Sequence, residues 1–276
     1  HQTVSMAELA VVYETRLGSA DRTDLEQEML HVLRAMERSM TPPPADDPVP
    51  NYLVPRQAAE LDDKMPLDMG VLNGCMRNAM AVMENGCAHR VVVAAPTAGS
   101  SGVIPASVVG VGRTLGRTEG EILDALWAAG LVGAFIANQA TFGAEVAGCQ
   151  AEIGAASCMA AAGVVQLLGG TVEEGFHAAA LAMQSLLGLI CDPVAGLVEF
   201  PCIQRNVTAS VMAAAAANMA MKGVRSPIPL DETIKAMLDV GQALPASLRC
   251  TCEGGLCATP TGRQLALQAV KCKARK

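Results

Sequence analysis

Apolar residues recur at helical spacing near the start of the chain. Over residues 6–17 and again over residues 25–36 they return every three or four positions. This spacing places apolar side chains on one face of a helix. Thr23 and Glu26 are spaced as a capping box, and we predict that they open the second helix. Residues 1–40 are therefore expected to form a peripheral helical pair on a larger body.

Prolines interrupt this pattern over residues 41–63. Pro42, Pro43 and Pro44 follow one another, and a proline cannot continue a helix because it lacks the N–H group and its ring clashes with the preceding turn. We predict an extended linker here, with a domain boundary. Residues 64–276 are expected to form the second, larger helical domain.

The chain after the linker is also dominated by helical patterns. Thr118 with Glu121 and Thr171 with Glu174 have the spacing of capping boxes. Alanine and glycine are frequent, which permits close contacts between helices. The predicted helices cover residues 69–87, 104–115, 118–138, 149–168, 171–188 and 231–244. We predict an all-α fold, a compact bundle of Ala/Gly-rich helices with a cysteine-lined pocket.

The composition supports a large core and narrows the possible partners. Apolar residues make up 51% of the 276 residues and charged residues only 17%. The net charge is -7 and no run of Lys and Arg precedes the tail at residues 271–276, which argues against a nucleic-acid partner. The apolar run 122–142 contains polar residues, and the run 207–221 is short for a bilayer. Both are predicted to be core helices, so no membrane partner is expected.

The ten cysteines are predicted to be reduced thiols in a cytoplasmic protein. The chain is long and apolar, and residues 1–10 show no signal-peptide pattern. Cys149, Cys191 and Cys202 each adjoin Gly, Pro or a polar cluster, where predicted helices start, stop or bend. Three thiolates that face one pocket suit a metal better than a disulfide, because three is odd and none has an obvious pairing partner.

A second group of cysteines lies near the C-terminus. Cys250, Cys252 and Cys257 belong to a loop rich in Gly and Thr. A zinc site built from them remains an open alternative, although their spacing matches no zinc-ribbon pattern.

Polar residues elsewhere are candidates for holding a small anion. Thr97, Ser100 and Ser101 belong to a loop of Pro, Gly and hydroxyl residues that leads into a predicted helix. Such a loop presents N–H groups and hydroxyls to a carboxylate or phosphate, and the alternative is an ordinary capped turn. Arg205 and Asn206 begin another helix, where they are suited either to hold a carboxylate beside thiolates or to contact the backbone.

Four further polar residues have two interpretations each. Glu152 lies three residues after Cys149, on the same helix face, and accepts a hydrogen bond from a ligand or substrate amine or makes a structural contact. Asn138 and Gln139 end a long apolar run, as helix caps or as part of a pocket wall. His177 is predicted to be a core or partly solvated histidine rather than a catalytic one.

Five sequence blocks, in this order, resemble those of the α subunit of the iron–sulfur-dependent bacterial L-serine dehydratases. The resemblance extends over residues 69–267, and the joint occurrence of the blocks is specific. The blocks are residues 94–105, 148–154, 187–196, 201–206 and 259–262. The resemblance implies an all-helical catalytic subunit.

For the cofactor, the resemblance implies a [4Fe–4S] cluster held by Cys149, Cys191 and Cys202. Three ligands leave one iron open as a Lewis acid for the hydroxyl and carboxylate of L-serine or a close hydroxy-amino acid. Loss of water then leads to pyruvate and ammonia, without pyridoxal phosphate. Such an enzyme serves amino-acid degradation and gluconeogenesis.

The resemblance also implies roles for the polar residues. Thr97, Ser100 and Ser101 would orient the substrate carboxylate. No residue of the chain is a convincing base for the α-proton, and in the family a β-type domain with a Ser/His-rich loop completes the site. A separate β subunit in a hetero-oligomer is therefore implied. The further residues implied near the substrate are Asn138, Gln150, Arg205 and Asn206.

Departures from the family pattern leave alternatives open. Gln184 and Gln204 stand where the family often has Lys, so threonine and cysteine are alternative substrates. Cys272 lies near the C-terminus, where the family often has a cysteine that can occupy the open iron. The alternative functions are a non-catalytic metal-binding or interaction subunit and a small-molecule binding module built on residues 97–102.

Overall fold

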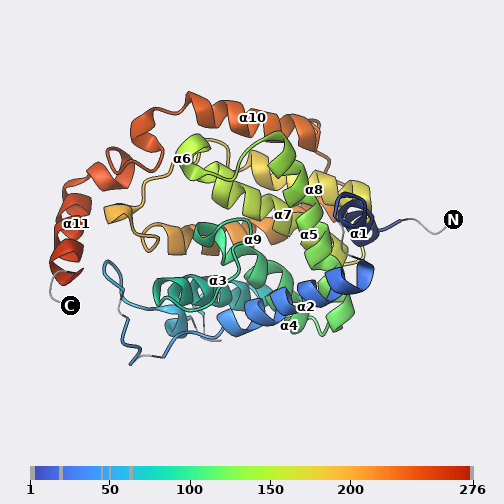
Figure 1. Cartoon of the computed structure of the whole chain (residues 1–276), viewed down its shortest axis with the longest axis horizontal. Coiled ribbons are helices and arrows are strands. Elements are labelled where there is room, and N and C mark those ends of the chain that lie inside the picture. The colour runs from blue at the N-terminus through green and yellow to red at the C-terminus, as the bar shows by residue number, and fades with distance from the viewer. Residues whose placement is uncertain (1–3, 19–20, 45, 50, 62–64, 274–276) are drawn as a thin grey trace.

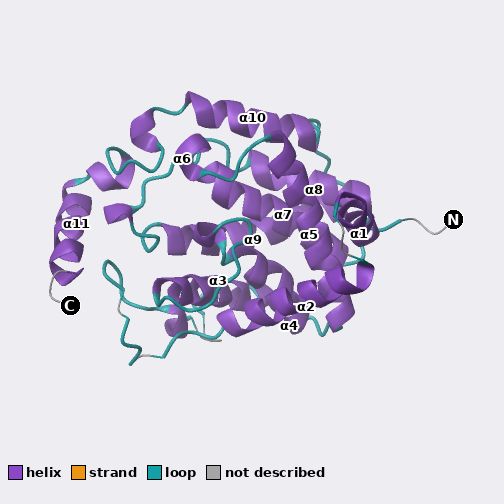
Figure 2. Cartoon of the chain, in the orientation of Figure 1, coloured by secondary structure: helices purple, strands orange, loops and turns teal. Residues whose placement is uncertain are grey.

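Helices form the regular secondary structure of the protein (Figure 2). The computed structural model describes residues 4–18, 21–44, 46–49, 51–61 and 65–273, with only the backbone described at 272 and 273, and no β-strand occurs in these ranges. The predicted all-α fold is thus confirmed. The α-helices are α1 (Met6–Leu17), α2 (Arg22–Ser39), α3 (Val71–Cys87), α4 (Val111–Thr114), α5 (Glu119–Gln139), α6 (Ala144–Ala147), α7 (Ala155–Leu167), α8 (Val172–Gln184), α9 (Cys202–Met221), α10 (Leu230–Ala243) and α11 (Pro260–Lys273).

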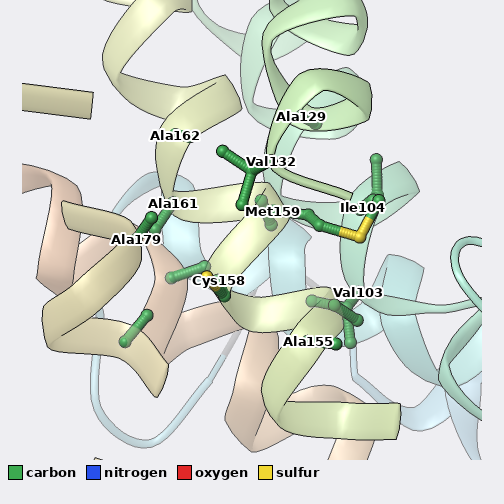
Figure 3. Close-up of a cluster of buried hydrophobic side chains, with 14 of the residues drawn as sticks. Val103, Ile104, Ala129, Val132, Ala155, Cys158, Met159, Ala161, Ala162 and Ala179 are labelled. Atoms are coloured by element: carbon green, nitrogen blue, oxygen red, sulfur yellow. The ribbon is translucent and has the colours of Figure 1, made fainter. Parts of the chain in front are cut away.

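Helix α7 is the centre of the bundle and packs against α5, α8 and α9 (Figure 1). Every residue of α7 except Gln166 is buried. A Cβ atom added at Gly163 would lie 2.9 Å from the carbonyl oxygen of Ala125 in α5, so glycine is needed for this close approach. Figure 3 shows Cys158 and Met159 of α7 among the apolar side chains of this core. The small residues therefore act as predicted, by allowing helices to approach closely.

Helix α5 is long and apolar enough to cross a membrane by length and composition alone. In this structure 56% of its most apolar window is buried inside the protein. Its start follows the predicted capping box, because the Thr118 side chain accepts from the Glu121 N–H while the Glu121 carboxylate accepts from the Thr118 N–H. In this fold α5 serves as a core helix, as the sequence predicted.

The N-terminal helices cover one side of the bundle. Ala7, Ala10 and Val11 of α1 pack on Trp127 and Leu131 of α5. This arrangement agrees with the predicted peripheral pair.

The start of α2 differs from the prediction. The helix begins at Arg22 because the Asp21 carboxylate accepts a hydrogen bond from the Asp24 N–H at 3.0 Å. The predicted capping box of Thr23 and Glu26 is therefore wrong. Glu26 instead pairs with Arg22, one turn away at 2.7 Å, and this i,i+4 pair favours the earlier start.

In its described residues, the proline-rich segment is non-helical apart from the short 3₁₀ turn Ala58–Glu60, and buried carboxylates hold it to the body. The Glu199 carboxylate accepts backbone N–H bonds from Tyr52 at 2.8 Å and Leu53 at 2.7 Å. The Glu84 carboxylate on α3 accepts from the N–H of Ala58 at 3.0 Å. Since Glu199 lies between Cys191 and Cys202 in the sequence, these bonds attach the segment to the cysteine-bearing loop.

We expect Glu199→Gln to loosen residues 51–54. The substitution replaces one acceptor oxygen by an NH₂ group that faces backbone donors, and an unsatisfied buried donor costs about 1–3 kcal/mol. The free energy of unfolding, measured by urea denaturation, should fall by that amount, and limited proteolysis should cleave the segment faster. Glu253→Gln, at an exposed position, is the control. Equal stability and equal proteolysis in both variants would contradict the anchoring role.

Candidate functional site

The three cysteines predicted as ligands come from three separate segments. Cys149 precedes the π-helical turn Gln150–Gly154 that leads into α7, Cys191 lies on the loop after α8, and Cys202 is the first residue of α9. Their side chains are 1%, 3% and 5% exposed, respectively, and all three are free thiols. The thiols therefore lie below the surface.

The pKa shifts of the three thiols depend on one another. Cys191 lowers the pKa of Cys149 through a side-chain interaction, and the charge on Cys149 adds to burial in raising the pKa of Cys202. Within the described ranges, no group of three or more His, Cys, Asp or Glu residues is placed to hold a single metal ion. A [4Fe–4S] cluster differs from a single ion because each cysteine binds its own iron, so the thiolates must stand further apart. Buried, reduced thiols from three segments are the donor set that such a cluster requires.

The surroundings favour a thiolate at Cys149. A hydrogen bond from Cys191 lowers the pKa of Cys149 below its ordinary value, with help from the nearby Arg205, although burial and Glu152 oppose the shift. The Nη1 atom of Arg205 lies 3.7 Å from the Cys149 sulfur. The pKa of Cys191 is raised by its hydrogen bond to Cys149, and the pKa of Cys202 is raised mainly by burial. Metal binding requires all three groups as thiolates and therefore releases protons, most readily from Cys149, whose pKa is lowered.

Arg205 connects the cysteine-bearing segments. Its Nη2 donates to Asp192 Oδ1 at 2.8 Å and its Nη1 donates to the carbonyl of Ile190 at 3.1 Å. The second carboxylate oxygen of Asp192 accepts from the N–H of Leu256 at 2.7 Å. Gly255 has φ +59°, and a Cβ there would lie 2.4 Å from that oxygen, so only glycine fits. Arg205 and Asp192 thus join the start of α9 to the loop after α8 and to the C-terminal loop.

Thr97, Ser100 and Glu152 lie together beside Cys149. The Thr97 hydroxyl donates to Glu152 Oε1 and lies 3.1 Å from the Ser100 hydroxyl. Glu152 Oε2 is 4.0 Å from the Cys149 sulfur. Burial raises the pKa of Glu152, and the bond from Thr97 opposes this shift. The structure thus brings two of the predicted hydroxyls and one carboxylate to the cysteine site.

Ser101 and Asn206 have contacts that fix the loop. The Asn206 amide donates to the carbonyls of Gly99 at 2.7 Å and Cys202 at 2.9 Å, and accepts from the N–H of Gly102 at 2.9 Å. The Ser101 hydroxyl faces the Met83 sulfur of α3 at 3.5 Å and is buried. Asn206 therefore ties the Thr97–Ser101 loop to the start of α9, and its amide makes backbone contacts, which was the alternative that the sequence left open.

Asn138 and Gln139 make their contacts outside the cysteine site. The Asn138 amide is exposed and donates to the Tyr13 hydroxyl of α1 at 2.7 Å, while Gln139 donates to Asp231 of α10 at 3.1 Å. Asn138 also donates to the Ala134 carbonyl of α5 at 2.9 Å, and Gln139 lies in the wall of a pocket between α5, α8 and α10. The hydrogen bonds described for Asn138 do not include the cysteine site.

Gln150 and His177 have structural contacts. Gln150 is buried and bonds the carbonyl of Ala147 at 3.0 Å and the N–H of Gly188 at 2.8 Å, which joins the start of the π-helical turn to the turn after α8. His177 Nδ1 accepts from the N–H of Ser226 at 3.2 Å, in agreement with its prediction as a structural histidine.

The C-terminal cysteines divide between two positions. Cys250 pairs with Cys191, since its N–H donates to the Cys191 carbonyl at 2.8 Å and the two thiols interact. The thiols of Cys252 and Cys257 both donate to the carbonyl of Pro193, at 3.5 and 3.0 Å. This division does not support the zinc alternative. Sequence reasoning missed Cys250 beside Cys191, because no local pattern indicates a backbone pairing between residues so far apart in the chain.

This leaves Gln184 and Gln204, which stand where the family often has Lys, and Cys272 near the C-terminus. Gln184 donates to the hydroxyls of Ser226 at 2.8 Å and Thr233 at 3.0 Å. The Oε1 atom of Gln204 is buried and has no hydrogen-bond partner among the described residues. The side chain of Cys272 lies outside the described part of the chain, so its predicted role as a cap on the open iron stays a prediction.

Comparison with known proteins gives the family. The family model described as serine dehydratase alpha chain matches residues 1–257. The chain belongs to this family. Among the relatives of this serine dehydratase alpha chain, "Probable L-serine dehydratase, alpha chain" of Bacillus subtilis is 38% identical over 272 residues, covering 95% of this chain and 89% of the relative. The protein of the same description from Latilactobacillus sakei is 45% identical over 193 residues, which is 70% of this chain and 92% of the relative.

A longer relative also matches nearly the whole chain. "L-serine dehydratase 1" of Escherichia coli is 38% identical over 267 residues, which is 91% of this chain and 58% of the relative. That relative therefore contains a substantial additional segment. The resemblance found in the five sequence blocks is confirmed at the level of the family.

Proposed function

We propose that this chain is the catalytic α subunit of an L-serine dehydratase that uses a [4Fe–4S] cluster held by Cys149, Cys191 and Cys202. The main support is the convergence of three buried, free cysteines from separate segments, with Arg205 beside them, in a chain of the serine dehydratase family. A cluster bound by three cysteines supplies a Lewis acid, because one iron has no protein ligand. The reaction removes the α-proton and the β-hydroxyl of L-serine, and the resulting aminoacrylate hydrolyses to pyruvate and ammonia.

In this proposal, residues of this chain bind the substrate and hold it in position. The Thr97 and Ser100 hydroxyls lie beside Glu152, which is 4.0 Å from the Cys149 sulfur. Ser100 is proposed to donate to the substrate carboxylate, and Thr97 joins it when substrate binding turns the Thr97 proton away from Glu152. Arg205 lies 3.7 Å from the Cys149 sulfur and adds to the effect of Cys191 in lowering the pKa of that thiol. Asn206 fixes the backbone between Gly99 and Gly102, so the hydroxyls keep their position. Such fixed positioning lowers the cost of orienting the substrate for reaction.

The α-proton base is proposed to come from a β subunit. The family description as an alpha chain and the additional segment of the Escherichia coli relative both support a second component. The active enzyme is therefore a hetero-oligomer. A cytoplasmic location is part of the proposal, and the free cysteines support it because glutathione and thioredoxin keep cysteines reduced there.

An anaerobic reconstitution tests the function. The purified chain is loaded with iron and sulfide, assayed for both elements and for visible absorption, and mixed with the β chain. We expect iron and sulfide in nearly equal amounts, brown colour, and pyruvate and ammonia from L-serine, with L-threonine and L-cysteine as alternative substrates in parallel assays. Colourless protein, or protein that holds stoichiometric zinc without sulfide, would contradict the proposal.

A further inference from the structure

Glu152 is a carboxylate without a cation beside it in the described part of the chain. Its two described contacts are the Thr97 hydroxyl at Oε1 and the Cys149 sulfur at 4.0 Å from Oε2. The cation next to Cys149 is Arg205, whose guanidinium is held by Asp192 at 2.8 Å and by the Ile190 carbonyl at 3.1 Å. Glu152 therefore has acceptor capacity that the fold leaves unfilled, since a carboxylate can accept about four hydrogen bonds.

Other carboxylates in this protein with similar or greater burial are fully engaged. Asp192 pairs with Arg205 and accepts from the N–H of Leu256. Glu199 accepts three backbone N–H groups, and Glu84 accepts two. Glu152 is only half-buried, so its unfilled acceptor positions are open to a partner that arrives from outside the chain.

The position of Glu152 is built by close packing. A Cβ at Gly99 would lie 2.5 Å from Glu152 Oε1, so the loop leaves room for the carboxylate only because this residue is glycine. An ammonium group with three N–H donors satisfies a carboxylate by charge-assisted hydrogen bonds.

We propose that Glu152 is the receptor for the α-ammonium group of the substrate. This inference rests on the proposed function, because it takes L-serine as the ligand. Glu152 then holds the ammonium group on the side of Cys149, and the Thr97 hydroxyl, which donates to Glu152 in this structure, turns its proton to the substrate carboxylate beside Ser100. The site therefore selects α-amino acids over α-hydroxy acids of the same shape.

The experiment compares L-serine with L-glycerate, which keeps the carboxylate and the β-hydroxyl but has a hydroxyl in place of the ammonium group. The cluster-loaded complex with the β chain gives KM for L-serine and the inhibition constant of L-glycerate, for the wild type and for Glu152→Gln. We expect KM for L-serine to rise roughly 10- to 100-fold, the range of a charge-assisted hydrogen bond. The inhibition constant of L-glycerate should change less than about threefold, because glycerate carries no charge for Glu152 to pair with.

Three controls make the result decisive. Glu145→Gln removes an exposed carboxylate close enough to act on Glu152 and should leave both constants unchanged. Iron and sulfide contents are measured in every variant, and Glu152→Asp, which keeps the charge, should recover part of the lost affinity for L-serine if Glu152→Gln folds poorly. Thr97→Val should weaken both ligands, because both carry the carboxylate.

Each outcome has one meaning. Equal weakening of L-serine and L-glycerate in Glu152→Gln, or no change in either, overturns the ammonium receptor while the proposed function stands. Weaker binding of the β chain with unchanged KM overturns it as well, because the partner's own cation would then pair with Glu152. A wild type without iron, sulfide or pyruvate formation contradicts the proposed function, and the receptor with it.

Discussion

Cys149→Ser should remove the cofactor and the activity together. A serine hydroxyl is a harder ligand that keeps its proton, whereas iron–sulfur clusters take soft thiolates. Iron and sulfide in the anaerobically reconstituted chain should therefore fall roughly tenfold or more. Pyruvate formation with the β chain should fall by about 10³-fold or more, because a Lewis acid contributes several kcal/mol and about 1.4 kcal/mol is a factor of ten.

The matching control is Cys252→Ser. Cys252 is an exposed free thiol that donates to the Pro193 carbonyl and lies outside the proposed ligand set. This variant should keep its iron, sulfide and activity. Both variants should keep the helical circular dichroism of the wild type, since apolar packing around α7 holds the helices together. Full iron content in Cys149→Ser would remove this residue from the ligand set.

Arg205→Met should strongly destabilise the protein even without a cofactor. The Arg205 side chain is 16% exposed and its partner Asp192 is 2% exposed, so the substitution leaves a buried carboxylate with only the Leu256 N–H. Breaking a buried pair in this way costs about 3–5 kcal/mol. Guanidinium chloride denaturation of the metal-free chain should show a loss of this size in the free energy of unfolding.

Two further variants test whether the lost stability comes from the buried ion pair or from the removal of any arginine charge. Arg205→Met combined with Asp192→Asn removes both charges and should recover roughly half of the lost stability. Arg34→Ala, at an Arg that is 45% exposed and pairs with Glu37 and Glu119, should cost less than about 1 kcal/mol. If Arg205→Met cost no more than Arg34→Ala, the pair would not hold the cysteine-bearing segments together.

Two neighbouring residues at the start of α9, Arg205 and Asn206, hold together the parts of the proposed site. Arg205 contacts Cys149 directly and reaches the C-terminal loop through Asp192. Asn206, the next residue on α9, holds the loop that carries Thr97 and Ser100. The first turn of α9 thus positions both the proposed ligands and the proposed substrate-binding hydroxyls, which explains why Cys202, Arg205 and Asn206 occur in one short block.

Local physical chemistry allowed much of this protein to be predicted from its sequence. Apolar periodicity predicts α3, α5 and α10, and the capping boxes at Thr118 and Thr171 mark where α5 and α8 start. These signals lie within a few residues of one another, so no knowledge of packing is needed to interpret them. The five sequence blocks predicted the family by their resemblance to known sequences, which is separate from these local signals.

Tertiary structure decided which side chains meet. Asn138 bonds Tyr13 rather than a pocket, Glu152 receives the Thr97 hydroxyl, and Cys250 lies beside Cys191. Each partner is more than fifty residues away in the sequence, so the contact depends on how whole helices pack. Even the start of α2 depended on choosing between two good capping residues, Asp21 and Thr23, and the Arg22 pair with Glu26 favoured the first. Sequence therefore determined the helices and the candidate chemistry, while packing determined the site, because long-range contacts have no local signature.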